Sequence, residues 1–267
     1  VAFRRPLPGD GRQPTGMPRL PALLDTAPDA PFPSPERALI EPDGLLAVGG
    51  DLSPARFLNA YRSGIFPWYS DGEPILWWSP AQRAVFRTDG VVLSSKLRRR
   101  LRNSGWTLRA DTAFAQVVTG CAAPRNGQAG TWITADMQRA YAQLHQLGIA
   151  HSIEVFAGER LVGGLFGLAF GHVFCGDSMY SAESGASSLA LAGLAWRLRA
   201  WGWPLIDAQV PNAHTRQLGV ETWPRATYLA ALADLRERPS QTGHWREHFG
   251  AWAAADVLQT ADHPRTD

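Results

Sequence analysis

The sequence predicts an α+β protein in which a small first domain precedes a larger domain built on a mixed sheet with helices on both faces. Three observations predict this fold class. A strand, a helix and a tryptophan-rich turn follow one another between residues 44 and 80. An antiparallel run of strands is predicted at 151–180. A nearly all-apolar helix at 187–200 then precedes a short strand at 205–210, which must pair in the same sheet.

Composition is that of an ordinary globular protein with room for one large or two modest domains. The chain has 267 residues, of which 45% are hydrophobic and 19% are charged. Its net charge of +2 permits a nucleic-acid partner without requiring one. No apolar run approaches the ~20 residues that cross a bilayer, and none follows the first arginines as a secretory signal requires. The two cysteines, Cys121 and Cys175, lack metal or redox spacing, so a cytoplasmic location without membrane contact is expected.

Four segments divide the chain. Residues 1–31 are rich in proline, show little apolar periodicity and are predicted to form a flexible extension. Residues 32–82 make the small first domain, residues 83–245 the larger one, and residues 246–267 a C-terminal tail.

The first domain is predicted to contain two helices and a strand. Ser34 caps a short helix that has a proline at its first position. Residues 44–50 form a short buried strand that ends in a glycine turn. Residues 55–63 form a helix that begins after Ser53 and closes at Gly64.

Residues 64–80 contain the densest group of aromatic residues in this domain. Two aromatic runs flank Asp71-Gly72, which is typical of a tight loop or hairpin rather than a helix. The large rings are Trp68, Tyr69, Trp77 and Trp78. Two interpretations fit them. They are a hydrophobic plug between domains, because tryptophan is usually buried, or a stacking platform that grips a base.

The second domain alternates helices and strands. An extended segment at 83–87 leads to predicted helices at 94–102, 111–118 and 134–148, strands at 151–156, 161–170 and 173–180, a helix at 187–200, a strand at 205–210 and a helix at 225–235. The helix that Thr134 caps carries one apolar stripe that we assign to the core: Met137, Ala140, Tyr141, Leu144 and Leu147.

The helix at 94–102 is strongly basic. Leu97 and Leu101 should point inward, surrounded by five cationic side chains without an acidic neighbour: Lys96, Arg98, Arg99, Arg100 and Arg102. Such a run is usually a solvated face, but unopposed charges also suit contacts to nucleic-acid phosphates.

Polar side chains interrupt the last short strand. Asp207 and Gln209 are two residues apart, so an extended strand places them on the same face. Asp177 is predicted at the end of the preceding strand, near the apolar Phe174 and Met179. Two carboxylates and an amide beside an apolar cavity favour a small-molecule site. The alternative is a hydrogen-bonded sheet edge or a surface pair.

Histidine and glycine patterns point to neither a metal nor a nucleotide site. His244 and His248 have a metal-compatible spacing, but no third ligand stands nearby, so a terminal helix face is expected and no metal. His214 follows the strand of Asp207 and could reach the same cleft. The sequence contains no Walker loop and no dinucleotide-binding glycine motif, which excludes nucleotide hydrolysis.

A series of motifs in order along residues 32–235 extends these inferences. They are Gly44-Leu-Leu-Ala-Val-Gly-Gly-Asp-Leu-Ser-Pro, Gly64-Ile-Phe-Pro-Trp-Tyr-Ser, Ile75-Leu-Trp-Trp-Ser-Pro, Gly130-Thr-Trp-Ile-Thr, His151-Ser-Ile-Glu-Val, Leu161-Val-Gly-Gly, Phe174-Cys-Gly-Asp-Ser-Met and Leu205-Ile-Asp-Ala-Gln-Val. Together they resemble the leucyl/phenylalanyl-tRNA–protein transferase family.

The resemblance implies an acetyltransferase-like (GNAT) second domain that uses aminoacyl-tRNA in place of acyl-CoA and needs no cofactor. The implied reaction moves Leu, Phe or, less well, Met from the tRNA 3′ ester to the N-terminal amine of a protein that begins with Arg or Lys. Its product is a bacterial degradation signal, an N-degron. Residues 184–188 stand where CoA-using relatives carry a phosphate-binding loop, and their sequence argues against CoA. A monomer is expected.

The resemblance also implies binding roles for residues. Trp68 would stack on the terminal adenosine of the tRNA, and Trp132 would wall the donor site. The acceptor stem would meet the basic helix, Lys96 and Arg98 to Arg102, through its phosphates. The pocket for the Leu or Phe side chain would consist of Leu165, Phe174, Gly176, Met179, Leu194, Leu198 and Ile206. Leu194 and Leu198 replace aromatic residues of the family, so this pocket should differ in shape.

The implied catalytic residues are Asp207, Gln209 and Asp177. A free α-amine attacks the ester carbonyl and the ribose oxygen leaves, so the enzyme need only position the amine and accept a proton. Because a neutral amide is a weak base, we assign Gln209 to orienting the amine and Asp207 to anchoring Gln209. Asp177 stands where the family usually has Glu, which is one methylene longer.

Three other functions share parts of these observations. A cell-wall aminoacyltransferase has the same fold and donor but accepts a peptidoglycan peptide. An acetyltransferase needs CoA, and a tRNA-binding module transfers nothing.

Overall fold

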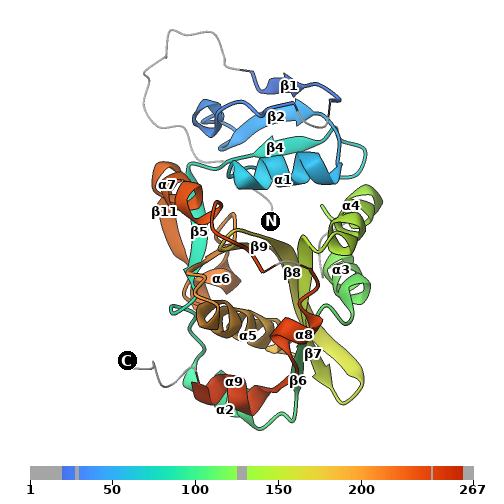
Figure 1. The fold of residues 1–267 in the computed structure, drawn as a ribbon, viewed down its shortest axis with the longest axis vertical. Coiled ribbons are helices and arrows are strands. Elements are labelled where there is room, and N and C mark those ends of the chain that lie inside the picture. The colour runs from blue at the N-terminus through green and yellow to red at the C-terminus, as the bar shows by residue number, and fades with distance from the viewer. Residues whose placement is uncertain (1–19, 28–29, 125–130, 242, 261–267) are drawn as a thin grey trace.

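Two sheets organise the computed structural model, which describes residues 20–27, 30–124, 131–241 and 243–260. The first sheet has four strands in the order β1-β2-β4-β3, and the second has eight in the order β11-β5-β10-β9-β8-β7-β6-β12. The four-stranded sheet lies at one end of the molecule, above the larger one (Figure 1). The predicted α+β class, with a mixed sheet flanked by helices, is confirmed.

The first sheet contains the predicted elements of the first domain. Its strands are β1 (Ala22–Leu24), β2 (Leu45–Gly49), β3 (Phe66–Pro67) and β4 (Leu76–Trp78). Ser34 caps the 3₁₀ helix η1 (Pro35–Arg37), and Ser53 caps α1 (Pro54–Arg62) by accepting a hydrogen bond from a backbone N–H, as predicted. The tryptophan-rich stretch is a hairpin in which β3 and β4 pair antiparallel.

The flexible extension predicted at residues 1–31 is wrong at residues 22–24, which form β1 and pair in parallel with β2. A strand of three residues is too short to show periodicity. The buried guanidinium of Arg56 on α1 donates to the carbonyls of Asp25 and Ala30 at 2.8 and 3.0 Å, so a distant residue fixes this segment. Residues 1–19 and 28–29 lie outside the described part of the chain.

The second sheet is mixed. Its strands are β5 (Gln82–Arg87), β6 (Thr107–Ala110), β7 (Ala150–Ala157), β8 (Arg160–Phe170), β9 (Val173–Ser181), β10 (Leu205–Asp207), β11 (Glu221–Pro224) and β12 (Trp252–Ala253). All neighbours pair antiparallel except β9 and β10, which are parallel. The central strands arise as predicted from the alternation and short turns between residues 150 and 181.

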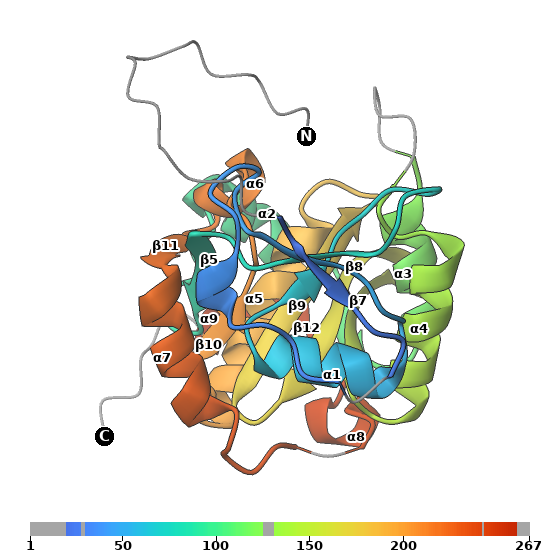
Figure 2. The ribbon, with the colours of Figure 1, turned by 90° about the horizontal axis from the view of Figure 1, so that it is seen from above.

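Helices cover both faces of this sheet. They are α2 (Ser95–Arg102), α3 (Phe114–Ala122), α4 (Ala135–Gln146), α5 (Ala186–Ala200), α6 (Ala213–Gln217), α7 (Arg225–Leu235), α8 (Arg246–Phe249) and α9 (Ala254–Thr260). One core joins the first sheet, α1, α3, α4 and α7 to one face, and a second core joins α2, α5 and α9 to the other. Seen from above, α1 lies between α7 and α4 (Figure 2).

Two details of the predicted helices are wrong. Helix α3 begins at Phe114 rather than at Asp111, because Asp111 has a φ of 55° and cannot belong to a right-handed helix. Leu147, the last member of the predicted apolar stripe, is 61% exposed, since α4 ends one residue before it. The other four members are buried.

The C-terminal tail predicted at residues 246–267 is wrong for its described part. Strand β12 pairs with β6, and α9 packs against α2 and α5. Phe249 and Val257 are fully buried in the second core. A strand of two residues and two short helices give too little periodicity to be predicted. Residues 261–267 lie outside the described residues.

The helices of the described ranges are all too short or too polar to span a membrane.

Candidate active site

The site lies where β10 ends beside β9. The parallel pairing of the two strands stops at Asp207 and Cys175, whereas β9 continues to Ser181. The chain leaves β10 at once, because Gln209 has a φ of 53° and its backbone N–H donates to Asp207 Oδ1 at 2.9 Å. The predicted strand at 205–210 is therefore wrong beyond Asp207. Gln209 owes its direction to this turn and not to strand alternation.

A β-bulge directs Asp177 toward Gln209. Phe166 of β8 pairs with Ser178 and Gly167 pairs with Gly176, so Asp177 is the extra residue of β9. The prediction that Asp177 ends its strand is wrong, since β9 runs four residues further. The bulge and the turn bring two polar side chains together, with Gln209 Nε2 2.8 Å from Asp177 Oδ1.

Asp177 is a carboxyl with a strongly perturbed environment. Its Oδ1 also accepts a hydrogen bond of 2.7 Å from the hydroxyl of Tyr61 on α1, which lies 3.3 Å from the hydroxyl of Tyr141 on α4. Its Oδ2 is buried and has no hydrogen-bond partner among the described residues. Burial raises the pKa of Asp177 to about 7, although the hydrogen bond from Tyr61 works in the opposite direction.

The two tyrosines were missed as site residues. Tyr141 belongs to the apolar stripe of α4, and Tyr61 is one of several aromatic residues near the end of α1. Burial raises the pKa of both hydroxyls well above the usual value, with Asp177 adding to the effect. Only the polar tip of an otherwise apolar ring indicates such a role in a sequence.

Asp207 is held in a buried ion pair. Arg83 of β5 donates to both of its oxygens, from Nε at 2.8 Å and from Nη2 at 2.6 Å, and the Tyr228 hydroxyl of α7 donates to Oδ2 at 2.9 Å. The Asp207 side chain is fully buried. Burial opposes the charge of Arg83, but Asp207 outweighs it and raises the pKa of the guanidinium. The structure thus links Asp207 to Gln209 through the backbone bond and encloses the carboxylate away from solvent.

The tryptophans of the β3–β4 hairpin divide into two kinds. Trp77 is fully buried against Phe32 and Phe57, at ring distances of 4.9 and 6.2 Å, and donates to the carbonyl of Gly49. Trp68 is only half-buried, with its ring 6.1 Å from that of Trp78. Trp132, just before α4, is also half-buried and packs against the same core as Tyr61 and Tyr141.

The residues predicted for the side-chain pocket lie on the opposite face of the sheet from Asp177 and Asp207. Six of them belong to or border the second core: Leu165, Phe174, Met179, Leu194, Leu198 and Ile206. The seventh is Gly176. Gly176 lies at the opening between β9 and β10. A Cβ added there would be 3.7 Å from Asp207 O and 3.8 Å from the Phe174 ring, which are ordinary contacts.

The basic helix α2 lies at the other end of the molecule from the first sheet (Figure 1). Leu101 is buried and Leu97 is partly buried, as predicted. Lys96, Arg99 and Arg100 are exposed, whereas Arg98 and Arg102 are half-buried. Arg100 donates to the carbonyl of Ser184, in the loop before α5.

The expectation that no further possible metal ligand lies near His244 is wrong. Asp111 and His145 each place an atom within 4.8 Å of His244, whereas His248 is not part of this group. Asp111 accepts a hydrogen bond of 2.6 Å from the backbone N–H of Trp245. Burial opposes its charge, but hydrogen bonds hold its pKa below the usual value; the first of these is from His151. These bonds anchor the segment before α8 to the sheet.

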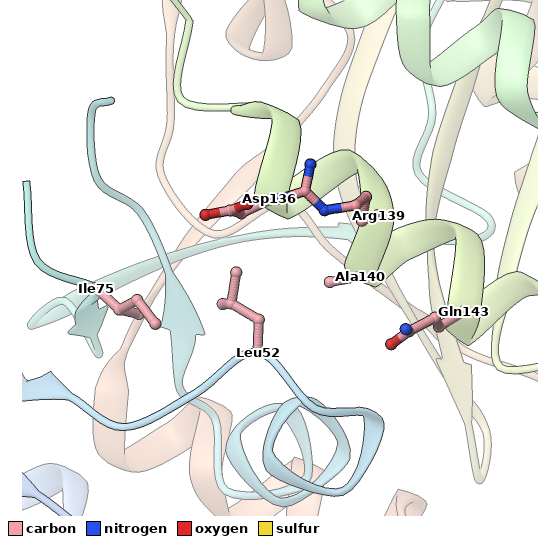
Figure 3. A pocket seen from close by; sticks show the side chains of 6 residues that line it. All are labelled: Leu52, Ile75, Asp136, Arg139, Ala140 and Gln143. Carbon is pink, nitrogen blue, oxygen red and sulfur yellow. Dashed lines mark hydrogen bonds and ion pairs between the residues drawn. The ribbon is translucent and has the colours of Figure 1, made fainter. Parts of the chain in front are cut away.

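The pocket of Figure 3 lies outside this site. It has a volume of about 310 Å³ and is lined by Leu52, Ile75, Asp136, Arg139, Ala140 and Gln143. The outer side of α4 forms one wall, and the loop before α1 and the residue before β4 form the other (Figure 3). Asp136 and Arg139 form an ion pair with each other. None of the residues predicted for the donor site or for catalysis lines this pocket.

The comparisons with known proteins give the class of the protein as an aminoacyltransferase. In the structure, the Asp177 carboxyl and the Gln209 amide meet where β9 and β10 part. The chain belongs to the leucyl/phenylalanyl-tRNA protein transferase family. Its residues 85–233 match the model of that family, and residues 50–81 match that of the family's N-terminal domain.

Relatives of high identity carry the family name. The leucyl/phenylalanyl-tRNA–protein transferase of Xanthomonas oryzae pv. oryzae (strain MAFF 311018) is 60% identical over 243 residues, which are 91% of this chain and 97% of that protein. The protein of the same name from Xylella fastidiosa (strain M23) is 53% identical over 239 residues, or 89% and 98% of the two chains. Among solved structures, L-PGS from Bacillus licheniformis is similar with a TM-score of 0.36 and 12% identity, over 81% of this chain and 72% of that one.

Proposed function

We propose that this protein transfers Leu, Phe and, less well, Met from aminoacyl-tRNA to the N-terminal amine of proteins that begin with Arg or Lys. The family of the chain supports the reaction. The observation that carries the site is the hydrogen-bonded pair of Asp177 and Gln209 at the opening between β9 and β10. The product would be an N-degron, and the enzyme would act as a cytoplasmic monomer.

The reaction needs one bond made and one broken. The amine nitrogen attacks the ester carbonyl, the ribose oxygen leaves, and one amine proton is transferred to that oxygen. Gln209 donates through Nε2 to Asp177, and no hydrogen bond from the described residues occupies its Oε1. That oxygen is available to accept an N–H of the amine and so aim its lone pair at the carbonyl.

Asp177 would supply the ionisable group nearest to the amine. With its pKa raised to about 7, the carboxyl exchanges a proton in the range where cellular enzymes work. Its ionised form attracts the incoming amine and accepts hydrogen bonds from Tyr61 and Gln209. Asp207 would act indirectly, as the anchor of the Gln209 backbone.

The donor would span both faces of the sheet. Trp68 and Trp132, beside the first core, would hold the terminal adenosine by stacking. The amino-acid side chain would pass Gly176 and enter between the apolar side chains of Phe174 and Leu194, which belong to the second core on the other face. Leu194 and Leu198 leave more room than the aromatic residues they replace. The cationic helix α2 would bind acceptor-stem phosphates without reading sequence.

Transfer of a labelled amino acid tests the proposal. Purified protein is mixed with labelled Phe-tRNA and reporter proteins that begin with Arg, Lys or Met. Label should appear on the Arg and Lys reporters and not on the Met reporter. Label on a peptidoglycan peptide would favour the cell-wall reaction, CoA-dependent acetylation would favour an acetyltransferase, and tRNA binding without transfer would favour a binding module.

A further inference from the structure

We propose that Arg83 is a positioning residue that holds the hairpin of the first sheet and the end of β10 in one fixed arrangement. The inference rests on the proposed function, in which Trp68 on the hairpin holds the donor and Gln209 after β10 orients the amine. Arg83 lies between them and contacts groups on both sides.

One guanidinium makes all of these contacts. Nε and Nη2 bind the two oxygens of Asp207, while Nη1 donates to the carbonyl of Gly64 at 3.1 Å. Gly64 lies two residues before β3, the first strand of the hairpin, and the ring of Phe66 in β3 lies 4.8 Å from the guanidinium carbon. The ring of Tyr228 lies 4.6 Å from the same carbon. The guanidinium of Arg83 is therefore held by hydrogen bonds at its edges and packed against two aromatic rings, and 1% of the surface of the residue is exposed.

These contacts belong to a closed ring of hydrogen bonds around the site. Asp207 accepts from the Gln209 backbone at 2.9 Å, and the Gln209 side chain donates to Asp177 at 2.8 Å. Asp177 accepts from the Tyr61 hydroxyl at 2.7 Å. The carbonyl of Tyr61 accepts from the N–H of Gly64 at 3.0 Å, and the carbonyl of Gly64 accepts from Arg83. A shift of the hairpin side of the ring, at Gly64, therefore changes the position of the β10 side, at Asp207 and Gln209, and the reverse also holds.

Only arginine fits this position. Its planar group offers five N–H donors in a fixed geometry, whereas lysine presents three donors on one atom. Lysine can keep the charge opposite Asp207 but cannot bind both carboxylate oxygens and Gly64 with the same directions. An ion pair that served stability alone would not need the contact to Gly64.

Arg56 provides a matched control. It is also a fully buried arginine that binds backbone carbonyls, those of Asp25 and Ala30, and it lies 3.5 Å from Asp51. These contacts lie on the side of α1 that faces the β1 segment. Replacing it with lysine disturbs a buried arginine without touching the ring around Asp177.

Double-mutant cycles test the inference. Arg83→Lys is combined with Trp68→Ala and, separately, with Gln209→Ala, and kcat/KM is measured for Phe-tRNA and for the Arg reporter. Arg83→Lys alone should lower kcat/KM by about tenfold to 100-fold through misplacement. In both cycles the combined loss should differ from the product of the single losses by at least about threefold. The Arg56→Lys cycles should stay within about twofold of the product.

The inference would be overturned if Arg83→Lys were coupled to only one of Trp68→Ala and Gln209→Ala. It would also be overturned if the coupling of Arg83→Lys were no larger than that of Arg56→Lys. If Arg83→Lys does not fold, Asp207→Asn replaces it, since this change weakens the ion pair at constant volume. Its cycle with Trp68→Ala should be coupled for the same reason, and an uncoupled cycle would be evidence against the ring. A wild-type protein without transfer would refute the proposed function itself, whereas active wild type with uncoupled cycles would refute only the role of Arg83.

Discussion

Asp177 shows how local backbone geometry determines the chemistry of one residue. The bulge in β9 directs its carboxyl toward Tyr61 and Gln209 instead of leaving it in ordinary strand alternation. Its Oδ2 is thereby buried, and burial raises the pKa of the carboxyl to about 7. A second carboxyl, Glu154 of β7, is fully buried, and burial raises its pKa to about 7 as well.

Stability should depend on pH through these two carboxyls. Both bind a proton more tightly in the folded than in the unfolded protein, because their pKa is raised on folding. Their contribution to the free energy of unfolding is complete below the unfolded pKa of about 4 and is lost as pH rises toward about 7. The slope should not exceed ~1.4 kcal/mol per pH unit for each group.

Urea unfolding from pH 5 to pH 8 checks this dependence. Asp177→Asn should flatten part of the decline, and Asp177→Asn with Glu154→Gln should flatten most of it. A decline that is unchanged in the double variant would show that other groups cause it.

At the scale of elements, the separation of β9 and β10 creates the site. The parallel pair ends at Asp207, and Gly176 is the first residue of β9 beyond it. The sequence predicts both strands and singles out three polar residues on or beside them, Asp177, Asp207 and Gln209. It does not predict the bulge at Asp177, which depends on the register with β8, or the turn at Gln209, which depends on a bond from its backbone to a side chain. Such features arise from contacts between distant residues and leave no local periodicity.

Gly176→Ala should obstruct the path between β9 and β10 that we propose for the donor side chain. The new Cβ meets only ordinary contacts at 3.7 Å or more, so the free energy of unfolding should change by less than about 1 kcal/mol. The side chain of the donor would lose the same space. Transfer of Phe should therefore fall about tenfold more than transfer of Leu, by comparison of kcat/KM. Gly90→Ala, outside the site, serves as the control, and an equal effect of Gly176→Ala on the transfer of both amino acids would contradict the proposed path.

At the scale of the whole molecule, the first and last elements of the described residues are part of the fold. Strand β1 joins the first sheet and β12 joins the second. Helix α9 packs against α2 and α5. These short elements escaped prediction because they are defined by pairing with β2 and β6 rather than by their own pattern. The buried arginine Arg56 and the carboxylate Asp111 tie the two end segments to the body of the protein.

Phe249→Ala tests the structural role of the C-terminal segment. The ring is fully buried in the second core, so its loss should lower the free energy of unfolding by ~3–5 kcal/mol. Leu147→Ala is the control, since that side chain is 61% exposed and its loss should cost less than about 0.5 kcal/mol. Equal stability of the two variants in denaturant unfolding would refute the assignment of residues 246–260 to the core.

The central claim is that Gln209 orients the amine for transfer from aminoacyl-tRNA. Single-turnover transfer of labelled Phe to a reporter that begins with Arg tests it most directly, with Gln209→Ala as the variant. Gln143→Ala, in the pocket of Figure 3, is the control for loss of a glutamine side chain. The account predicts wild-type transfer by Gln143→Ala and a rate at least about 100-fold lower for Gln209→Ala. A Gln209→Ala rate within about twofold of wild type, with both proteins equally folded, would contradict it.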